Sequence, residues 1–166
     1  APVVLVNNTE MTDLYPANDV PGAIWQISPD LPAGLTLDVN TGIISGTPTE
    51  AMENTTFTLW ANTSEPRSVE STFYLEVLED TDGDGMPDTL PDDYPDTGLP
   101  PFDLIEDLDD DADGTPDVDE AINGTDSLNP DTDGDGFCDG PSAVDGECYA
   151  GPDSHPLDPA LPVNTD

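Results

Sequence analysis

Short runs of alternating apolar and polar residues fill the first half of the chain. Residues 57–60 read Phe-Thr-Leu-Trp and residues 73–77 read Phe-Tyr-Leu-Glu-Val, a period of two that is typical of half-buried β-strands. Other short apolar runs occupy residues 3–6, 23–27, 35–37 and 42–46, with Gly, Pro and Asn between them. The pattern predicts about six or seven strands packed as a two-sheet sandwich. The side chains predicted to face its interior are Trp25, Ile27, Leu35, Leu37, Phe57, Leu59, Phe73, Leu75 and Val77.

The pattern changes at residues 79–80, where the alternation stops and Asp-Gly loops begin. Residues 1–79 contain 11 acidic residues, 7 of them Glu, whereas residues 80–166 contain 27, of which 24 are Asp. We therefore predict a mostly β protein of two domains. Residues 1–79 form the sandwich, and residues 80–166 form an irregular, Asp-rich region with little regular secondary structure.

One Asp-rich stretch has the complete spacing of a calcium-binding loop. Residues 109–120 place carboxylates at positions one, three, five, nine and twelve, Gly at position six, and a residue whose backbone carbonyl can bind at position seven. Ca²⁺ takes six to eight oxygen ligands, and a Glu at position twelve can bind through both of its oxygens. The stretch predicts a calcium site made by Asp109, Asp111, Asp113, Thr115, Asp117 and Glu120. Residues 118–122 are predicted to form at most a short helical turn.

Two partial copies of this loop flank it. Each has the four Asp residues of positions one, three, five and nine and a backbone carbonyl at position seven. The copies are made by Asp80, Asp82, Asp84, Met86 and Asp88, and by Asp131, Asp133, Asp135, Phe137 and Asp139.

Neither partial copy has a carboxylate at position twelve, so each must borrow one from outside its own loop. We predict that Asp92, or an Asp at position 93 or 96, completes the first site. We expect Asp145 to complete the third site and Asp126 to serve either neighbouring ion. Two isolated residues near the C-terminus, Asp153 and Asp158, either cap a last ion or are solvated.

The negative charge of the chain restricts the classes of molecule that it can bind. The chain has 38 acidic residues against one Lys or Arg, which gives a formal net charge of −37. A protein binds nucleic acid or an anionic membrane surface through clustered basic residues, so both are excluded as partners of this chain. The sequence also has no apolar run of the roughly 18 residues that a membrane-spanning helix needs.

Acidic disorder and a salt-adapted surface are alternative explanations of this charge. Both would mix and scatter Glu and Asp, whereas the second half clusters Asp at alternate positions with Gly. Ordered calcium sites are therefore favoured. Because this half has few large apolar residues, metal binding must supply its folding free energy.

Three further features of the sequence bear on the cellular compartment of the protein. Cys138 and Cys148 lie close in sequence and are predicted to form a disulfide in an oxidising environment, the alternative being two free thiols. Sequons for N-glycosylation begin at Asn7, Asn54, Asn62 and Asn123. These sites are either glycosylated or unmodified loops. The start at Ala1 without Met is expected for a mature or excised product.

Both halves resemble known families. Residues 25–38 and 40–49, which include Leu-Pro-Ala-Gly and Asn-Thr-Gly turns, resemble immunoglobulin-like repeats of microbial surface proteins, related to cadherin-like modules. That resemblance implies a non-catalytic stalk, spacer or adhesion module. The Asp-x-Asp-x-Asp-Gly-x-x-Asp loops resemble thrombospondin type 3 repeats in their microbial form, over residues 80 to about 158. This resemblance implies little hydrophobic core and several calcium ions that share carboxylates between loops.

We expect the chain not to be an enzyme. Neighbouring calcium would lower the pKa of paired carboxylates such as Asp92 and Asp93, whereas a general acid needs a raised pKa. Ser154 and His155 are adjacent, which is poor geometry for a nucleophile and its base.

The sequence instead favours an extracellular or cell-surface calcium-binding structural protein, a subunit of a fibre assembled head to tail. The alternative is an adhesin or spacer module that binds a glycan or a protein. In a fibre, the run at residues 3–6 could pair with a neighbour's sheet as an added strand and make a homo-oligomer. It could equally remain in its own sheet.

Overall fold

The structure is a computed structural model, and it describes residues 3–18, 20–63, 68–91, 104–149 and 151–161. The chain forms two compact units, Ala1–Ile105 and Glu106–Asp166. The first acidic loop therefore groups with the β-sandwich, although the strands themselves end near the predicted boundary at residue 79.

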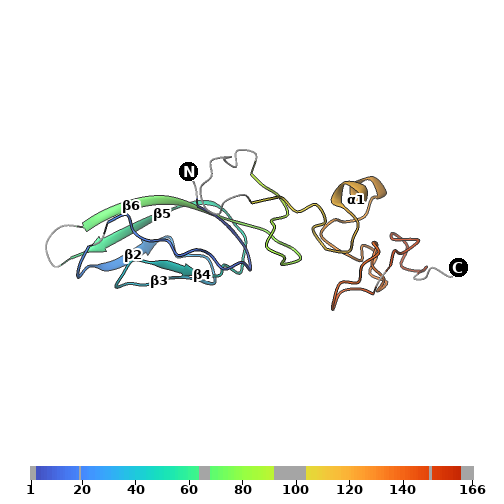
Figure 1. Cartoon of the computed structure of the whole chain (residues 1–166), viewed down its shortest axis with the longest axis horizontal. Coiled ribbons are helices and arrows are strands. Elements are labelled where there is room, and N and C mark those ends of the chain that lie inside the picture. Colours follow the sequence, from blue (N-terminus) through green and yellow to red (C-terminus); the bar gives the residue numbers. More distant parts are fainter. Residues whose placement is uncertain (1–2, 19, 64–67, 92–103, 150, 162–166) are drawn as a thin grey trace. The chain divides into compact units, whose positions relative to one another are not determined.

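The six strands found among the described residues all belong to the first unit (Figure 1). Four strands form one sheet in the order β1-β6-β5-β2, and two form a second sheet. The strands are β1 (Val3–Val6), β2 (Ile24–Ser28), β3 (Leu35–Leu37), β4 (Ile44–Gly46), β5 (Met52–Asn62) and β6 (Ser68–Leu78). The predicted mostly β sandwich is confirmed.

The two long strands β5 and β6 form the centre of the larger sheet. They pair antiparallel, with Phe57 opposite Phe73 and Asn62 opposite Ser68. Strand β1 runs parallel to β6 and pairs with it from Val3 opposite Leu75 onward. Of the two alternatives for residues 3–6, the structure therefore shows this strand in its own sheet.

The interior is apolar and lies between the two sheets. Six of the predicted interior residues are buried, namely Trp25, Leu35, Phe57, Leu59, Leu75 and Val77. The other three, Ile27, Leu37 and Phe73, are partly buried and pack against this core. The rings of Phe57 and Phe73 stack with their centroids 5.6 Å apart. Met11, Ile44 and Ala61 are also buried, although the alternation pattern did not single them out.

The second unit has little regular structure. Its one helix among the described residues is α1 (Asp117–Asn123), which Gly124 ends in a left-handed conformation. The Gly124 N–H donates to the Glu120 carbonyl, which closes the last turn. Among the described residues, no helix has the length and apolar character needed to cross a membrane.

Substitutions of two glycines, Gly42 and Gly22, would test how tightly the chain packs around Trp25. Gly42 and Gly22 have φ angles of +77° and +75°, but a Cβ on Gly42 would lie 2.5 Å from Trp25 Cδ2, whereas a Cβ on Gly22 would meet nothing within 4 Å. Gly22→Ala should cost about 1–2 kcal/mol, because only the left-handed backbone is disfavoured. Gly42→Ala should incur the same backbone cost and, because its Cβ would overlap the Trp25 ring, a further overpacking cost of about 1–3 kcal/mol.

Urea unfolding followed by tryptophan fluorescence measures both costs. Equal destabilisation by the two substitutions would show that the contact between Gly42 and Trp25 does not constrain the sandwich.

Candidate metal centres

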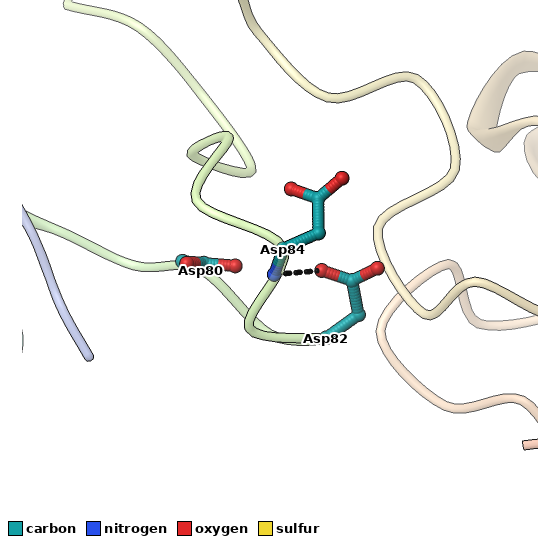
Figure 2. Close-up of side chains that lie close together, drawn as sticks. All are labelled: Asp80, Asp82 and Asp84. Atoms are coloured by element: carbon teal, nitrogen blue, oxygen red, sulfur yellow. Dashed lines mark hydrogen bonds between the residues drawn. The ribbon is translucent and has the colours of Figure 1, made fainter. Parts of the chain in front are cut away.

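The first acidic loop holds its carboxylates through backbone hydrogen bonds. The Asp80 carboxylate accepts from the Gly83 N–H at 2.9 Å and from the Gly85 N–H at 3.1 Å. Asp82 Oδ1 accepts from the Asp84 N–H at 3.0 Å, and Asp84 Oδ1 accepts from the Met86 N–H at 2.8 Å. Figure 2 shows the three side chains gathered around this bend. The loop backbone therefore orients each carboxylate of the predicted first site.

The second loop repeats the scheme. Asp111 Oδ1 accepts from the Asp113 N–H at 3.1 Å, and Asp113 Oδ1 accepts from the Thr115 N–H at 2.7 Å. The Asp109 carboxylate accepts from the Gly114 N–H at position six, at 3.3 Å.

In the third loop, Asp133 Oδ1 accepts from the Asp135 N–H at 3.1 Å, and Asp135 Oδ1 accepts from the Phe137 N–H at 3.0 Å. The Asp131 carboxylate accepts from the Gly136 N–H at 2.7 Å. Three stretches of sequence thus fold into the same local structure because they carry Asp and Gly at the same positions.

The Asp at position nine closes each loop. In all three loops its carboxylate accepts from the backbone N–H of position two: Asp88 from Thr81 at 2.8 Å, Asp117 from Asp110 at 3.0 Å and Asp139 from Thr132 at 3.2 Å. The second oxygen of Asp88 accepts from Thr81 Oγ1 at 2.8 Å, whereas the second oxygen of Asp139, Oδ1, is buried without a donor among the described residues.

Several Asp residues of the second and third loops accept a backbone hydrogen bond with one carboxylate oxygen and bury the other oxygen. Among the described residues, no donor reaches the buried atoms Asp111 Oδ2, Asp133 Oδ2, Asp135 Oδ2 and Asp139 Oδ1. Glu120 has the same arrangement, because its Oε1 accepts from Thr125 Oγ1 at 3.2 Å while its buried Oε2 has no donor. Buried charged oxygens without partners are strongly unfavourable unless a cation satisfies them.

The geometry brings the carboxylates of each loop close enough for one ion. The ligand atoms of each set lie within 4.8 Å of one another, the sets being Asp80, Asp82 and Asp84; Asp109, Asp111 and Asp113; and Asp131, Asp133 and Asp135. These three clusters could each hold a metal ion. Glu120, on helix α1, is fully buried, as position twelve of the second loop requires.

The second and third loops meet inside the second unit. The Gly140 N–H donates to Asp113 Oδ2, and the Ser142 N–H donates to the Asp113 carbonyl at 2.7 Å. A side chain on Gly140 would overlap Asp113, so the close approach requires glycine. The charge of the adjacent Asp139 helps to raise the pKa of Asp111. Asp139, predicted as a ligand of the third site, therefore also lies near the second cluster.

Asp153 lies beside the third loop, for which the sequence predicted Asp145 as the completing ligand. The Asp153 N–H donates to the Cys138 carbonyl at 2.9 Å, which holds this residue beside the third loop. Its Oδ1 accepts from the His155 N–H at 2.9 Å, its Oδ2 is buried without a donor among the described residues, and its charge helps to raise the pKa of Asp133. Asp145 is exposed. The sequence offered only an isolated Asp after the second cysteine as a signal for this residue.

The predicted disulfide between Cys138 and Cys148 is present, with an S–S distance of 2.02 Å. The backbone alongside it is paired as well, because the Cys138 N–H donates to the Tyr149 carbonyl at 2.8 Å. The disulfide therefore connects the third loop to the segment that leads to Asp153.

Other predicted residues have different surroundings. Asp126 and Asp158 are exposed and accept from nearby backbone N–H groups, and Asp92 lies outside the described residues. Asp107, which the sequence did not single out, is buried and accepts from the Leu108 and Asp109 N–H groups.

The four sequons differ in exposure. Asn54, Asn62 and Asn123 are exposed, whereas Asn7 is buried in the sandwich. The Asn62 amide donates to Gln26 Oε1 at 2.9 Å. The folded domain therefore does not present the Asn7 side chain for glycosylation.

The electrostatics of the second cluster follow from burial. Burial, and then the neighbouring carboxylates, raise the pKa of Asp111 to about 7 and that of Glu120 to about 7. Burial is also the largest cause that raises the pKa of Asp80, Asp109 and Asp139. The only Lys or Arg of the chain is Arg67, which lies outside the described residues. Among the described residues, no Lys or Arg therefore lies beside these carboxylates.

These pKa shifts predict opposite pH dependence for the metal-free and the metal-bound protein. In the absence of metal, folded Asp111 and Glu120 keep protons that the unfolded chain loses near pH 4. The free energy of unfolding should therefore fall as pH rises from about 4 to about 7 and then level off. Cation affinity should rise over the same range, because the cation displaces these protons.

Chelated and cation-loaded samples, unfolded in urea at a series of pH values, test both trends. Cation affinity that does not change between pH 5 and pH 8 would contradict the assignment of these two carboxyls as ligands.

Asp153 and Asp145 offer a matched pair of substitutions for the third cluster. Asp153→Asn should weaken the binding of one divalent cation about tenfold or more, because a carboxylate ligand loses its charge. Asp145→Asn should leave the affinity unchanged, since that side chain is exposed. Isothermal titration calorimetry measures both, and equal affinities for the two variants would remove Asp153 from the site.

Comparison with known proteins identifies the sandwich. Residues 3–78 match the sequence model of a family described as "Putative Ig domain". Among solved structures, a Bacteroides fragilis protein described as a "putative alpha-galactosidase/melibiase" is 25% identical, with a TM-score of 0.35 over 46% of this chain and 16% of that chain. The PKD domain of the KIAA 1837 protein is 18% identical, with a TM-score of 0.34 over 47% of this chain and 80% of that chain. No curated protein matches the chain. Residues 3–78 form an immunoglobulin-like domain.

Proposed function

We propose that the protein is an extracellular calcium-binding structural protein and a subunit of a surface fibre. One observation carries the calcium assignment. Three loops with the same hydrogen-bond scheme each gather three Asp carboxylates, and several of the second oxygens are buried without a donor among the described residues. A chain with one Lys or Arg cannot neutralise them itself.

The chemistry of the ligands favours Ca²⁺ over other common ions. All candidate ligands are oxygens on flexible loops, which suits the six to eight ligands and variable geometry of Ca²⁺. Mg²⁺ needs a stricter octahedron and keeps several waters. Zn²⁺ prefers nitrogen and sulfur, but the two cysteines form the disulfide and the single His, His155, is exposed.

Burial indicates a structural role for the ions. Of the apolar side chains other than proline that are described within residues 106–161, the disulfide cysteines alone are buried. A unit with so little core needs another source of folding free energy, which bound Ca²⁺ supplies. The ions therefore act as an internal scaffold, in the way that disulfides do in small secreted domains.

The surface location rests on two features. Immunoglobulin-like domains are typical of surface proteins, and a disulfide persists in oxidising compartments. We propose no catalytic role. Ser154 Oγ and His155 Nδ1 lie 2.9 Å apart, but both side chains are exposed and neither lines the cavity of the sandwich.

A spacer or adhesin module is the second candidate. Strand β1 pairs with β6 of its own chain, so β1 is not free to act as the added strand of a neighbouring subunit. This pairing favours a module that works as part of a longer array over a subunit that donates β1.

Two measurements separate these functions. Native mass spectrometry of the purified chain should find about three or more Ca²⁺ ions, since each loop gathers one set of carboxylates. Negative-stain images in millimolar calcium should show fibres that dissolve on addition of EGTA. Fewer than about two ions would contradict the calcium assignment. A monomer in calcium at all concentrations would contradict the fibre and leave the spacer or adhesin.

A further inference from the structure

Position eight distinguishes the third loop from the other two. In every loop this position lies between two predicted ligands, at positions seven and nine, so it affects how both are held. The first and second loops have proline there, Pro87 and Pro116, whose ring fixes the backbone angle φ. The third loop has Cys138, which the disulfide joins to Cys148. A covalent bond to another segment therefore replaces a local restraint of the backbone.

Backbone hydrogen bonds surround this disulfide. Cys138 is fully buried, and Cys148 is 8% exposed. The Cys138 N–H donates to the Tyr149 carbonyl at 2.8 Å, and the Tyr149 N–H donates to the Gly136 carbonyl at 2.9 Å. The third loop is therefore paired with the residue that directly follows the second cysteine.

Asp153 is held from the same place. Its N–H donates to the Cys138 carbonyl at 2.9 Å, and a side chain on Gly151 would overlap that carbonyl oxygen, so the close approach requires glycine. Asp153 is 9% exposed, and its Oδ2 has no donor among the described residues. Asp133 Oδ2 is buried in the same way, and the two carboxylates interact through their charges. A cation bound at the third loop would satisfy both oxygens.

The segment between the two cysteines has little burial of its own. Residues 141–143 and 145–147 are exposed. Val144, which forms an isolated β-bridge with Cys148, is only partly buried. A segment without a buried apolar side chain has no core to keep it in one conformation. The disulfide therefore fixes where this segment ends, and with it the part of the chain that leads to Asp153.

We propose that the Cys138–Cys148 disulfide is a positioning element of the third metal site, which holds Asp153 beside the cluster of Asp131, Asp133 and Asp135. Loss of the bond should weaken the binding of one cation about 10–100-fold, as loss of a group that orients a ligand typically does. This inference rests on the proposed calcium function. It adds that the affinity for one ion depends on the thiol redox state of the chain.

The coupling between the ion and the bond is reciprocal. A dithiol reductant gives two electrons and two protons to the bond, becomes a disulfide itself, and leaves thiols at Cys138 and Cys148. Its thiolate must first reach a sulfur atom, and both cysteines are buried. A cation in the third site keeps the surrounding segment closed, so it should slow this reduction.

A double-mutant cycle tests whether the disulfide acts through Asp153. The paired change Cys138→Ser and Cys148→Ser should lower the affinity for one Ca²⁺ about 10–100-fold. The loss should be the same in an Asp145→Asn background, because that carboxylate is exposed within the segment that the disulfide closes. In an Asp153→Asn background the paired change should cause little further loss, since the positioned ligand has already lost its charge. Isothermal titration calorimetry of the whole chain measures the affinities, and circular dichroism in calcium checks that each variant is folded.

The outcomes separate this inference from the proposed function. An equal loss in the Asp153→Asn background would overturn the inference, because the disulfide would then stabilise the unit without acting on this ligand. An unchanged affinity after removal of the cysteines would also overturn it, and both results would leave the calcium function standing. If the oxidised wild-type chain binds no Ca²⁺, the proposed function and the inference fail together.

The rate of disulfide reduction replaces the cycle if the chain without cysteines does not fold. The calcium concentration is set to fill the third site of Asp145→Asn but not that of Asp153→Asn. A dithiol should then reduce Asp153→Asn several-fold faster, as measured by alkylation of the new thiols and mass spectrometry. Equal rates for the two variants would count against the inference.

Discussion

The second unit depends on one electrostatic constraint, which is that no Lys or Arg side chain among the described residues neutralises its buried carboxylates. Asp111, Asp113 and Glu120 are at most 2% exposed, and the single Arg of the chain lies outside the described residues. Such a cluster is unfavourable as anions and is only partly relieved by protonation. On the proposed function, external cations neutralise this cluster and take the place of an apolar core in a unit built of loops, a disulfide and one short helix.

The two units are stabilised in different ways. The sandwich buries aromatic and aliphatic side chains, and its stability comes from burial and packing. In the acidic unit Asp111, Asp133 and Asp135 each accept a backbone N–H with one oxygen, while the other oxygen is buried without a donor among the described residues. The loop hydrogen bonds thus orient carboxylates that could bind a cation. The hydrogen bonds from the loop backbone to the carboxylates account for Asp, rather than Glu, at nearly every loop position, because the shorter side chain reaches the backbone of its own loop.

Local features of the fold could be predicted from the sequence, and long-range ones could not. Alternation predicted the strands and the burial of Phe57 and Leu75, and the repeated Asp-Gly spacing predicted the three clusters. Asp153 was left open because its position depends on a backbone bond to Cys138 that spacing does not encode. The approach of Asp139 to the second cluster depends likewise on the contact between Gly140 and Asp113.

Hydrogen–deuterium exchange of the whole chain, with calcium and with EGTA, tests the central claim most directly. Amides of residues 108–140 should be protected with calcium and exchange rapidly with EGTA, because their loop structure requires the cations. Amides of β5 and β6 should be protected in both conditions, because the sandwich is held by its apolar core. Equal protection of residues 108–140 in the two conditions would contradict the account, since the acidic unit would then fold without the ions.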